Sequence, residues 1–115
     1  MDLKTLVASI LAERVTADVA TVYALVLVAR EELKLDVEVT PLAVEKTIRE
    51  LVDEGCAAEY IETSMDLSRR FRKYIITDKI KTLAKPLPAK TRRVADMRYV
   101  TPTFYALLNY TALPP

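Results

Sequence analysis

The side chains best placed to do chemistry in this sequence are a cluster of arginines and a lysine near residue 70. Four basic side chains fall within five positions, and these are Arg69, Arg70, Arg72 and Lys73. Guanidinium and ammonium groups bind phosphate, and the planar fork of Arg can bond two phosphate oxygens at once. Each phosphate contact also releases a counterion, so binding strengthens as the salt concentration falls. The residue types therefore favour binding of a polyanion.

Residue types that most catalytic mechanisms need are missing. The 115 residues include no His, one Cys (Cys56) and one Gly (Gly55). A single chain therefore cannot build a Cys/His zinc site, a His acid–base group or a Ser-His or Cys-His nucleophile, and one Gly leaves no phosphate-cradling loop. The acidic residues show no spacing that favours a carboxylate metal site. We predict that the protein is not an enzyme, uses no cofactor or metal, and buries Cys56 at the start of a strand.

The net charge of +1 hides a strong polarity along the chain. Residues 1–65 carry six basic and thirteen acidic side chains, a balance of −7, whereas residues 66–100 carry eleven basic and three acidic ones, a balance of +8. A basic run is often no more than a solvated surface, and this one could also pair with the acidic half of the molecule. The position of the basic residues on the fold decides between these alternatives.

Local patterns predict three helices before the basic cluster. Asp2 is a plausible N-cap for the first helix, and Thr40 followed by Pro41 is typical of the start of the third. Gly55 is typical of the residue just after a helix end. The predicted ranges are 2–14, about 17–33 and 41–54, with a short strand or extended arm at 37–39.

The basic cluster itself falls on a predicted β-hairpin. Runs rich in Tyr and Ile predict two strands, and a polar segment between them predicts an open, solvated loop. Helical turns, a proline-rich break and further short helices are expected after the hairpin. The predicted ranges are 57–63 and 71–77 for the strands, 64–70 for the loop, 78–84 for the turns, 85–88 for the break, and 91–99 and 101 onward for the helices.

We predict one domain over residues 1–115, mainly α with a small β-hairpin (α+β). The chain does not begin with a basic segment followed by an apolar one, as a signal peptide would. The uncharged run 19–29 is too short to span a bilayer, so we expect a cytoplasmic protein that does not associate with a membrane. The sequence has no Gln and one Asn (Asn109), a depletion reported for proteins of hyperthermophiles. A heat-adapted source is therefore expected.

Both ends of the chain are candidate dimerisation elements. The N-terminal helix 1–14 has a nearly uncharged outer face along Leu3–Leu11, and the C-terminal helical tail 90–113 includes the aromatic, charge-free segment Tyr99–Tyr110. Large exposed apolar patches mark interfaces, and aromatic side chains remove much area from water. We expect a homodimer through these two regions, although the tail could instead fold back over its own core.

Residues 39–84 resemble a winged helix-turn-helix of the MarR-like (multiple-antibiotic-resistance-regulator) type. The segment from Thr40 to Gly55 has the pattern of a recognition helix with its glycine stop. Asp66-Leu67-Ser68-Arg69-Arg70 has the pattern of the wing, and Tyr74-Ile75-Ile76-Thr77-Asp78-Lys79 has that of the strand that follows. The resemblance covers about 45 of the 115 residues.

The resemblance implies a dimeric, double-stranded DNA-binding protein that regulates transcription. It implies a positioning helix at about 17–33, a recognition helix at 41–54 in the major groove, and a wing at about 64–72 on the backbone or in the minor groove. The recognition helix is itself acidic, so we expect contact led by the wing. The implied DNA-binding residues are Thr40, Glu45, Lys46, Arg49, Arg69, Arg70, Arg72 and Lys73.

A second interpretation comes from the acids of the predicted recognition helix. Glu45, Glu50, Asp53 and Glu54 outnumber its two basic side chains. These acids and the apolar termini favour a winged-helix module that binds another protein in a transcription, replication or viral assembly.

Overall fold

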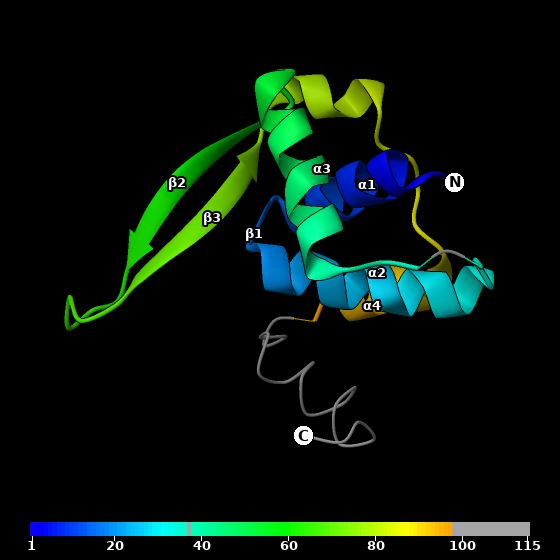
Figure 1. Ribbon diagram of the computed structural model, residues 1–115, viewed down its shortest axis with the longest axis horizontal. Coiled ribbons are helices and arrows are strands. Elements are labelled where there is room, and N and C mark those ends of the chain that lie inside the picture. The colour runs from blue at the N-terminus through cyan, green and yellow to red at the C-terminus, as the bar shows by residue number, and fades with distance from the viewer. Residues whose placement is uncertain (37, 98–115) are drawn as a thin grey trace.

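The computed structural model describes residues 1–36 and 38–97, and it begins with two helices capped in the same way (Figure 1). α1 (Leu3–Arg14) starts behind Asp2, whose carboxylate accepts a hydrogen bond from the Thr5 amide at 2.7 Å. α2 (Val19–Leu33) starts behind Asp18, which accepts one from the Thr21 amide at 2.8 Å. Each carboxylate satisfies a first-turn amide that has no partner within its helix. Both predicted helices are confirmed, and α2 begins two residues later than expected.

The third helix has the best-marked ends in the sequence. α3 (Pro41–Asp53) starts behind Thr40, whose hydroxyl oxygen accepts a hydrogen bond from the Ala43 amide at 3.1 Å. At its other end Gly55 has a φ of 79°, the left-handed conformation that Gly adopts without a Cβ clash. The predicted start at 41 is confirmed, and the helix ends one residue before the predicted 54. The arm predicted at 37–39 forms no strand at Glu38 or Val39, which are the described residues of that segment.

A β-hairpin follows α3 and joins a short strand from the start of the chain. β2 (Ala57–Thr63) pairs antiparallel with β3 (Arg70–Ile76), and β3 also pairs with β1 (Thr16–Ala17), giving the sheet order β1-β3-β2. β1 was not predicted, because two residues are too few to show an alternating pattern. Figure 1 shows the outer half of the hairpin reaching well away from the helices.

The rest of the described chain returns to the helices. η1 (Asp78–Thr82) is a 3₁₀ helix where helical turns were predicted, and α4 (Ala89–Ala95) follows the proline-rich break. Within residues 1–36 and 38–97 the chain thus has four α-helices and a three-stranded antiparallel sheet, which confirms an α+β domain. The helix predicted from 101 lies outside the described residues.

α4 is held to the helical body at both of its ends. Glu32 of α2 accepts hydrogen bonds from the backbone amides of Lys90 and Thr91, at 2.9 and 2.8 Å, in place of a side-chain cap. At the other end the Arg14 guanidinium donates to the carbonyls of Ala95 and Met97, at 3.0 and 3.2 Å. The described part of the predicted C-terminal dimerisation element therefore packs on its own chain.

The core lies between α1, α2 and α3. Six consecutive α1 residues, from Leu6 to Leu11, are all buried, and Val22, Ile48 and Tyr74 join them from α2, α3 and β3. Most of the Leu3–Leu11 segment expected at a dimer interface is thus occupied within one chain. The other predicted dimer segment, Tyr99–Tyr110, lies outside the described residues, so the homodimer stays a prediction.

Candidate nucleic-acid interface

The predicted site residues lie on two elements, the outer side of α3 and the hairpin. On α3 the hydroxyl oxygen of Thr40 serves as the helix cap, while Lys46 and Arg49 are exposed. Arg49 donates to Glu45 one helical turn earlier, at 3.2 Å. The negative charge of Glu45 offsets the positive charge of Arg49. Lys46 is therefore the one exposed cation of α3 that forms no ion pair with a described residue.

The hairpin pairs two of its four predicted cations. Arg72 contacts Glu59 on the neighbouring strand, with 3.0 Å between Nε and Oε1, and Lys73 pairs with Glu62. Both pairs join β3 to β2 in the half of the sheet that projects from the body. Exposed pairs of this kind contribute little to stability, but they reduce the positive charge that the strands offer to a polyanion.

Register divides the hairpin cations between two faces. Arg70, Arg72 and Tyr74 alternate along β3 and therefore share one face, and Lys73 lies on the other. Tyr74 is fully buried at the base of the hairpin. The structure thus separates Lys73 from the two arginines with which it was grouped in the sequence.

Tyr74 marks where α3 and the arginine face of the hairpin meet. Burial raises the pKa of its phenol, Glu59 raises it further, and the positive charges of Arg49 and Arg72 oppose both. Charges from α3 and from the hairpin therefore act on the same buried group. Its hydroxyl has no hydrogen-bond partner in the described part of the chain. Arg49 of α3 and Arg72 of the hairpin thus lie toward one edge of the molecule at the base of the hairpin, whereas Lys73 lies on the other face of the sheet.

The two remaining arginines lie at the tip of the hairpin, Arg69 at the end of the loop and Arg70 at the start of β3. Arg69 and Arg70 are exposed, and neither guanidinium forms an ion pair with any residue that the structure describes. The loop is closed by the Ser64 amide, which donates to the Arg69 carbonyl at 3.0 Å. These two side chains are therefore the free positive charges farthest from the helices.

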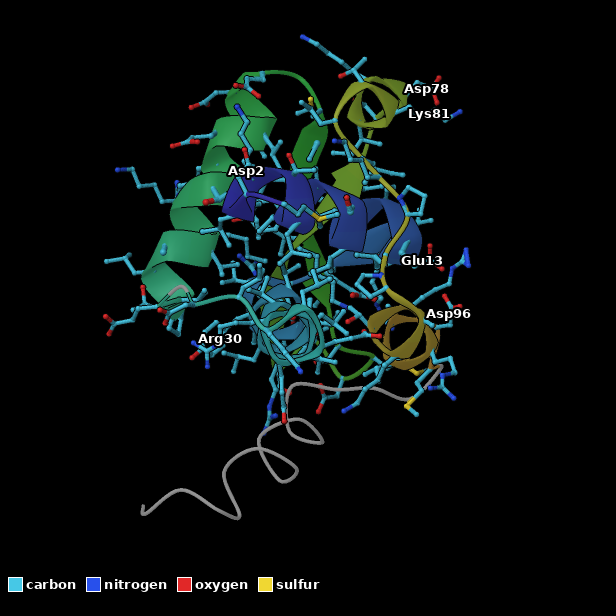
Figure 2. The ribbon with its side chains drawn as sticks, turned by 90° about the vertical axis from the view of Figure 1, so that its right-hand side faces the viewer. Asp2, Glu13, Arg30, Asp78, Lys81 and Asp96 are labelled. Atoms are coloured by element: carbon cyan, nitrogen blue, oxygen red, sulfur yellow. The ribbon has the colours of Figure 1, made fainter. Side chains whose placement is uncertain are left out.

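The rest of the basic segment does not extend this edge. Lys79 and Lys81 lie on η1, where the Lys79 ammonium donates to the Glu54 carbonyl at 2.7 Å, while Arg92 and Arg93 lie on α4. Figures 1 and 2 show η1 and α4 at opposite ends of the molecule, with Lys81 and Asp96 marking them in Figure 2. Most basic side chains of residues 66–97 are thus divided among the hairpin, η1 and α4.

The acids of α3 line its outer surface beside this edge. Glu50 and Asp53 are exposed, and Glu54 at the helix end pairs with Lys4 of α1. Lys4 and Lys79 together hold the end of α3 against α1 and η1. The acidic character of the predicted recognition helix therefore remains at its surface.

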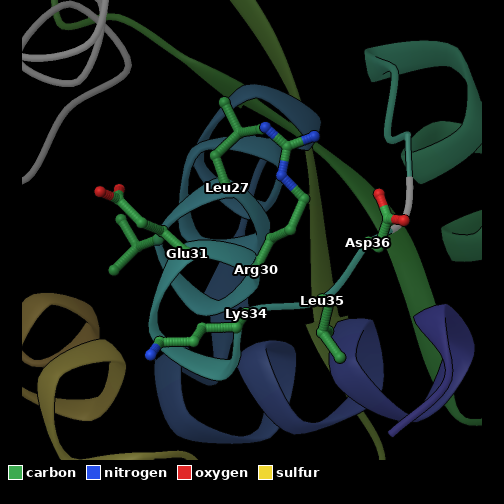
Figure 3. Close-up of a pocket in the computed structure, with 7 residues that line it drawn as sticks. Leu27, Arg30, Glu31, Lys34, Leu35 and Asp36 are labelled. Atoms are coloured by element: carbon green, nitrogen blue, oxygen red, sulfur yellow. The ribbon is translucent and has the colours of Figure 1, made fainter.

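Besides a hollow of about 610 Å³ beside the hairpin, whose lining includes Asp18, Met65 and Lys73, two further shallow hollows were not predicted from the sequence. One, of about 540 Å³, lies beside the end of α2, and Figure 3 shows Leu27, Arg30, Glu31, Lys34 and Asp36 around it. Its mixed charges select neither an anion nor a cation. The other, of about 420 Å³, lies on the outer side of α3 among Leu42, Glu45, Lys46 and Arg49. It adds an apolar side chain to the α3 part of the candidate interface.

Two further features of the described chain bear on function. Among residues 1–36 and 38–97, no three Cys, Asp or Glu side chains gather so that they could hold a metal ion. No helix in those ranges has both the length and the apolar character needed to cross a membrane.

No protein-family model, curated protein or solved structure matches the chain.

Proposed function

We propose that the chain is a winged-helix protein that binds double-stranded DNA and regulates transcription. Its β2–β3 hairpin makes the main contact with DNA, and α3 makes a secondary one. The order α1-β1-α2-α3-β2-β3 is compatible with a winged-helix arrangement. In such an arrangement α3 is the recognition helix and the hairpin is the wing. The MarR-like resemblance of residues 39–84 belongs to this proposal.

The observation that carries the proposal is the pair of unpaired arginines at the hairpin tip. Arg69 and Arg70 are exposed at the tip of a hairpin that projects from the body, whereas Arg49 and Arg72 have carboxylate partners. A guanidinium without an internal partner is available to phosphate, and Lys46 adds one positive charge from α3. Few cations and an acidic helix favour backbone contact over base reading, so binding should be modest and tolerant of sequence.

Two copies would present two hairpins to one duplex. A two-fold dimer of winged helices places its wings about one DNA turn apart. Because Leu6–Leu11 is buried in each chain, a dimer contact must come from other surfaces, and Tyr99–Tyr110 remains the candidate segment. Sedimentation of the full chain measures its oligomeric state.

The test of DNA binding is a salt series with charge-reversed tips. We expect fluorescence anisotropy of a labelled duplex of about 20 base pairs to report binding that weakens steeply between about 50 and 200 mM salt. R69E with R70E should lower the affinity by about tenfold or more and reduce the slope of log K against log salt by about 2, because two phosphate contacts are lost. The control, K81E with R93E, changes the net charge equally on η1 and α4 and should leave most of the affinity intact.

Two results would contradict the assignment. One is an absence of salt-sensitive binding by the wild-type chain. The other is an equal loss in both double variants, which would mean that net charge rather than the tip governs binding.

A second candidate function rests on the acids at the surface of α3. Glu50 and Asp53 are exposed and form no ion pair with any described residue, and Leu42 in the first turn of the same helix is also exposed. A basic, apolar protein segment would suit this surface better than DNA. Purification with one specific partner, lost in E50K with D53K but kept in R69E with R70E, would favour this interaction module.

A further inference from the structure

Two large apolar side chains occupy the tip of the hairpin. Met65 is 103% exposed and Leu67 is 78% exposed, which makes them the two most exposed large apolar side chains among the described residues. Single apolar side chains are common on protein surfaces. These two differ because they share one short loop at the outermost end of a projecting hairpin (Figure 1). The predicted DNA-binding set leaves both out.

Hydrogen bonds within the loop order the backbone that carries these two side chains. The Asp66 carboxylate accepts hydrogen bonds from both serine hydroxyls, Ser64 and Ser68, at 2.6 Å, and from the Ser68 amide at 3.0 Å. The Leu67 amide donates to the Ser64 carbonyl at 2.9 Å, and Leu67 has a left-handed φ of 62°. A tip ordered in advance loses less conformational freedom when it inserts into a partner.

The charges beside the tip indicate the kind of partner. Arg69 and Arg70 follow Leu67 after one intervening residue, Ser68, and neither has a carboxylate partner among the described residues. Asp66 lies between the apolar side chains and keeps its negative charge while both serines donate to its carboxylate, so the two arginines leave the tip with a net positive charge. An apolar end with cations behind it fits a surface that is apolar inside and lined with anions, as the base stack and phosphates of a DNA groove are.

We infer that Met65 and Leu67 form a wedge that enters the minor groove and separates two stacked base pairs while Arg69 and Arg70 hold the flanking phosphates. This inference rests on the proposed DNA binding and specifies its substrate, a duplex that is already kinked or kinks easily. Apolar wedges of this kind bend DNA by about 20–90°, and flexible pyrimidine–purine steps open most readily.

If Met65 and Leu67 act as a wedge, the protein should bind more tightly to DNA in which two neighbouring base pairs are already unstacked. A duplex with a short central bulge has already undergone unstacking, so it should bind about tenfold or more tightly than the intact duplex. End-labelled intact duplex should also show increased energy transfer between its ends as the wild-type chain bends it. Changing both tip side chains in M65S with L67S should remove the bend and reduce the preference to about twofold or less.

The salt slope separates this inference from the proposed function. M65S with L67S keeps both tip arginines, so its slope of log K against log salt should equal that of the wild-type chain. The matched control, L33S with M97S, changes one Leu and one Met away from the hairpin and should keep the bend and the preference. Loss of folding in the tip variant would show in its circular dichroism, in which case M65A with L67A replaces it.

Three outcomes would overturn the wedge. In the first, the wild-type chain binds DNA with a steep salt dependence but neither bends it nor prefers the bulged duplex. In the second, M65S with L67S bends DNA as the wild type does. In the third, the wild-type chain sediments with vesicles of phosphatidylcholine and phosphatidylglycerol through Met65 and Leu67 and leaves DNA straight. A chain without salt-sensitive DNA binding would instead contradict the proposed function itself.

Discussion

Helix α3 and the β2–β3 hairpin carry similar numbers of predicted DNA-binding residues, yet they differ in how those residues are held. α3 buries Val44, Thr47, Ile48 and Leu51 against the body. One of its two basic side chains, Arg49, forms an ion pair with Glu45. The hairpin is fixed at its base by Tyr74 and exposed along its outer half, where Arg69 and Arg70 have no carboxylate partner among the described residues. Local pairing, more than the number of basic residues, therefore separates the guanidinium groups that have a carboxylate partner from those that do not.

The largest expected contrast between the two elements is in stability. Ile48 of α3 is fully buried and Ile61 of β2 is 53% exposed, so the same change to Ala tests each region. I48A should lower the free energy of unfolding by about 2–5 kcal/mol, because it removes apolar contact and leaves a cavity. I61A should lower it by about 0.5 kcal/mol or less. Denaturant unfolding measures both, and similar losses would mean that the outer hairpin is as much a part of the core as α3.

The helical body, represented by Glu13 of α1, and the hairpin tip should respond to pH in opposite directions. A hydrogen bond that the protonated Glu13 carboxyl donates to Asp96, followed by burial and the negative charge of Asp96, raises the pKa of Glu13 in the helical body, where Figure 2 shows the two side chains close together. Hydrogen bonds from Ser64 and Ser68 lower the pKa of Asp66 at the tip to about 2. The folded state therefore holds the Glu13 proton more tightly than the unfolded state does, and the Asp66 proton less tightly.

Each carboxyl gives a distinct pH dependence of stability. The contribution of the protonated Glu13 is present below its unfolded pKa of 4.5 and is lost as pH rises through the folded value, so E13Q should gain stability over the wild type toward neutral pH. The contribution of Asp66 is present above 3.8 and is lost as pH falls toward about 2, so D66N should be less stable at neutral pH and converge with the wild type in acid. Melting temperatures between pH 2 and 7 measure both, and parallel curves would contradict the assignment.

Much of the fold followed from local signals in the sequence. The ends of α3 were predicted to within one residue because Thr40, Pro41 and Gly55 each perform a local task that depends on residue type. β1 was missed because two residues show no pattern, and their strand conformation comes from pairing with the distant Tyr74 and Ile75. Strands β2 and β3, by contrast, are rich in Tyr and Ile, and this composition is visible in the sequence of each strand alone.

The candidate site was harder to predict because it depends on register and on three-dimensional placement. Pairing of Arg72 with Glu59, and of Lys73 with Glu62, follows from the alignment of β2 with β3, which the sequence did not fix. The basic segment looked continuous along the chain, but η1 and α4 carry parts of it to opposite ends of the molecule. Met65 and Leu67 had one local signal, two apolar residues inside a polar loop, and the sequence prediction did not use it.

The measurement that tests the leading role of the hairpin most directly compares two double variants, R69A with R70A at the tip and K46A with R49A on α3. Each removes two positive charges, so an equal effect is expected if charge alone matters. Because Arg49 is already paired with Glu45, the α3 variant should reduce the slope of log K against log salt by about 1 or less, and the tip variant by about 2. Duplex binding across a salt series gives both slopes. A larger loss in the α3 variant would contradict the account and return α3 to the position of primary contact.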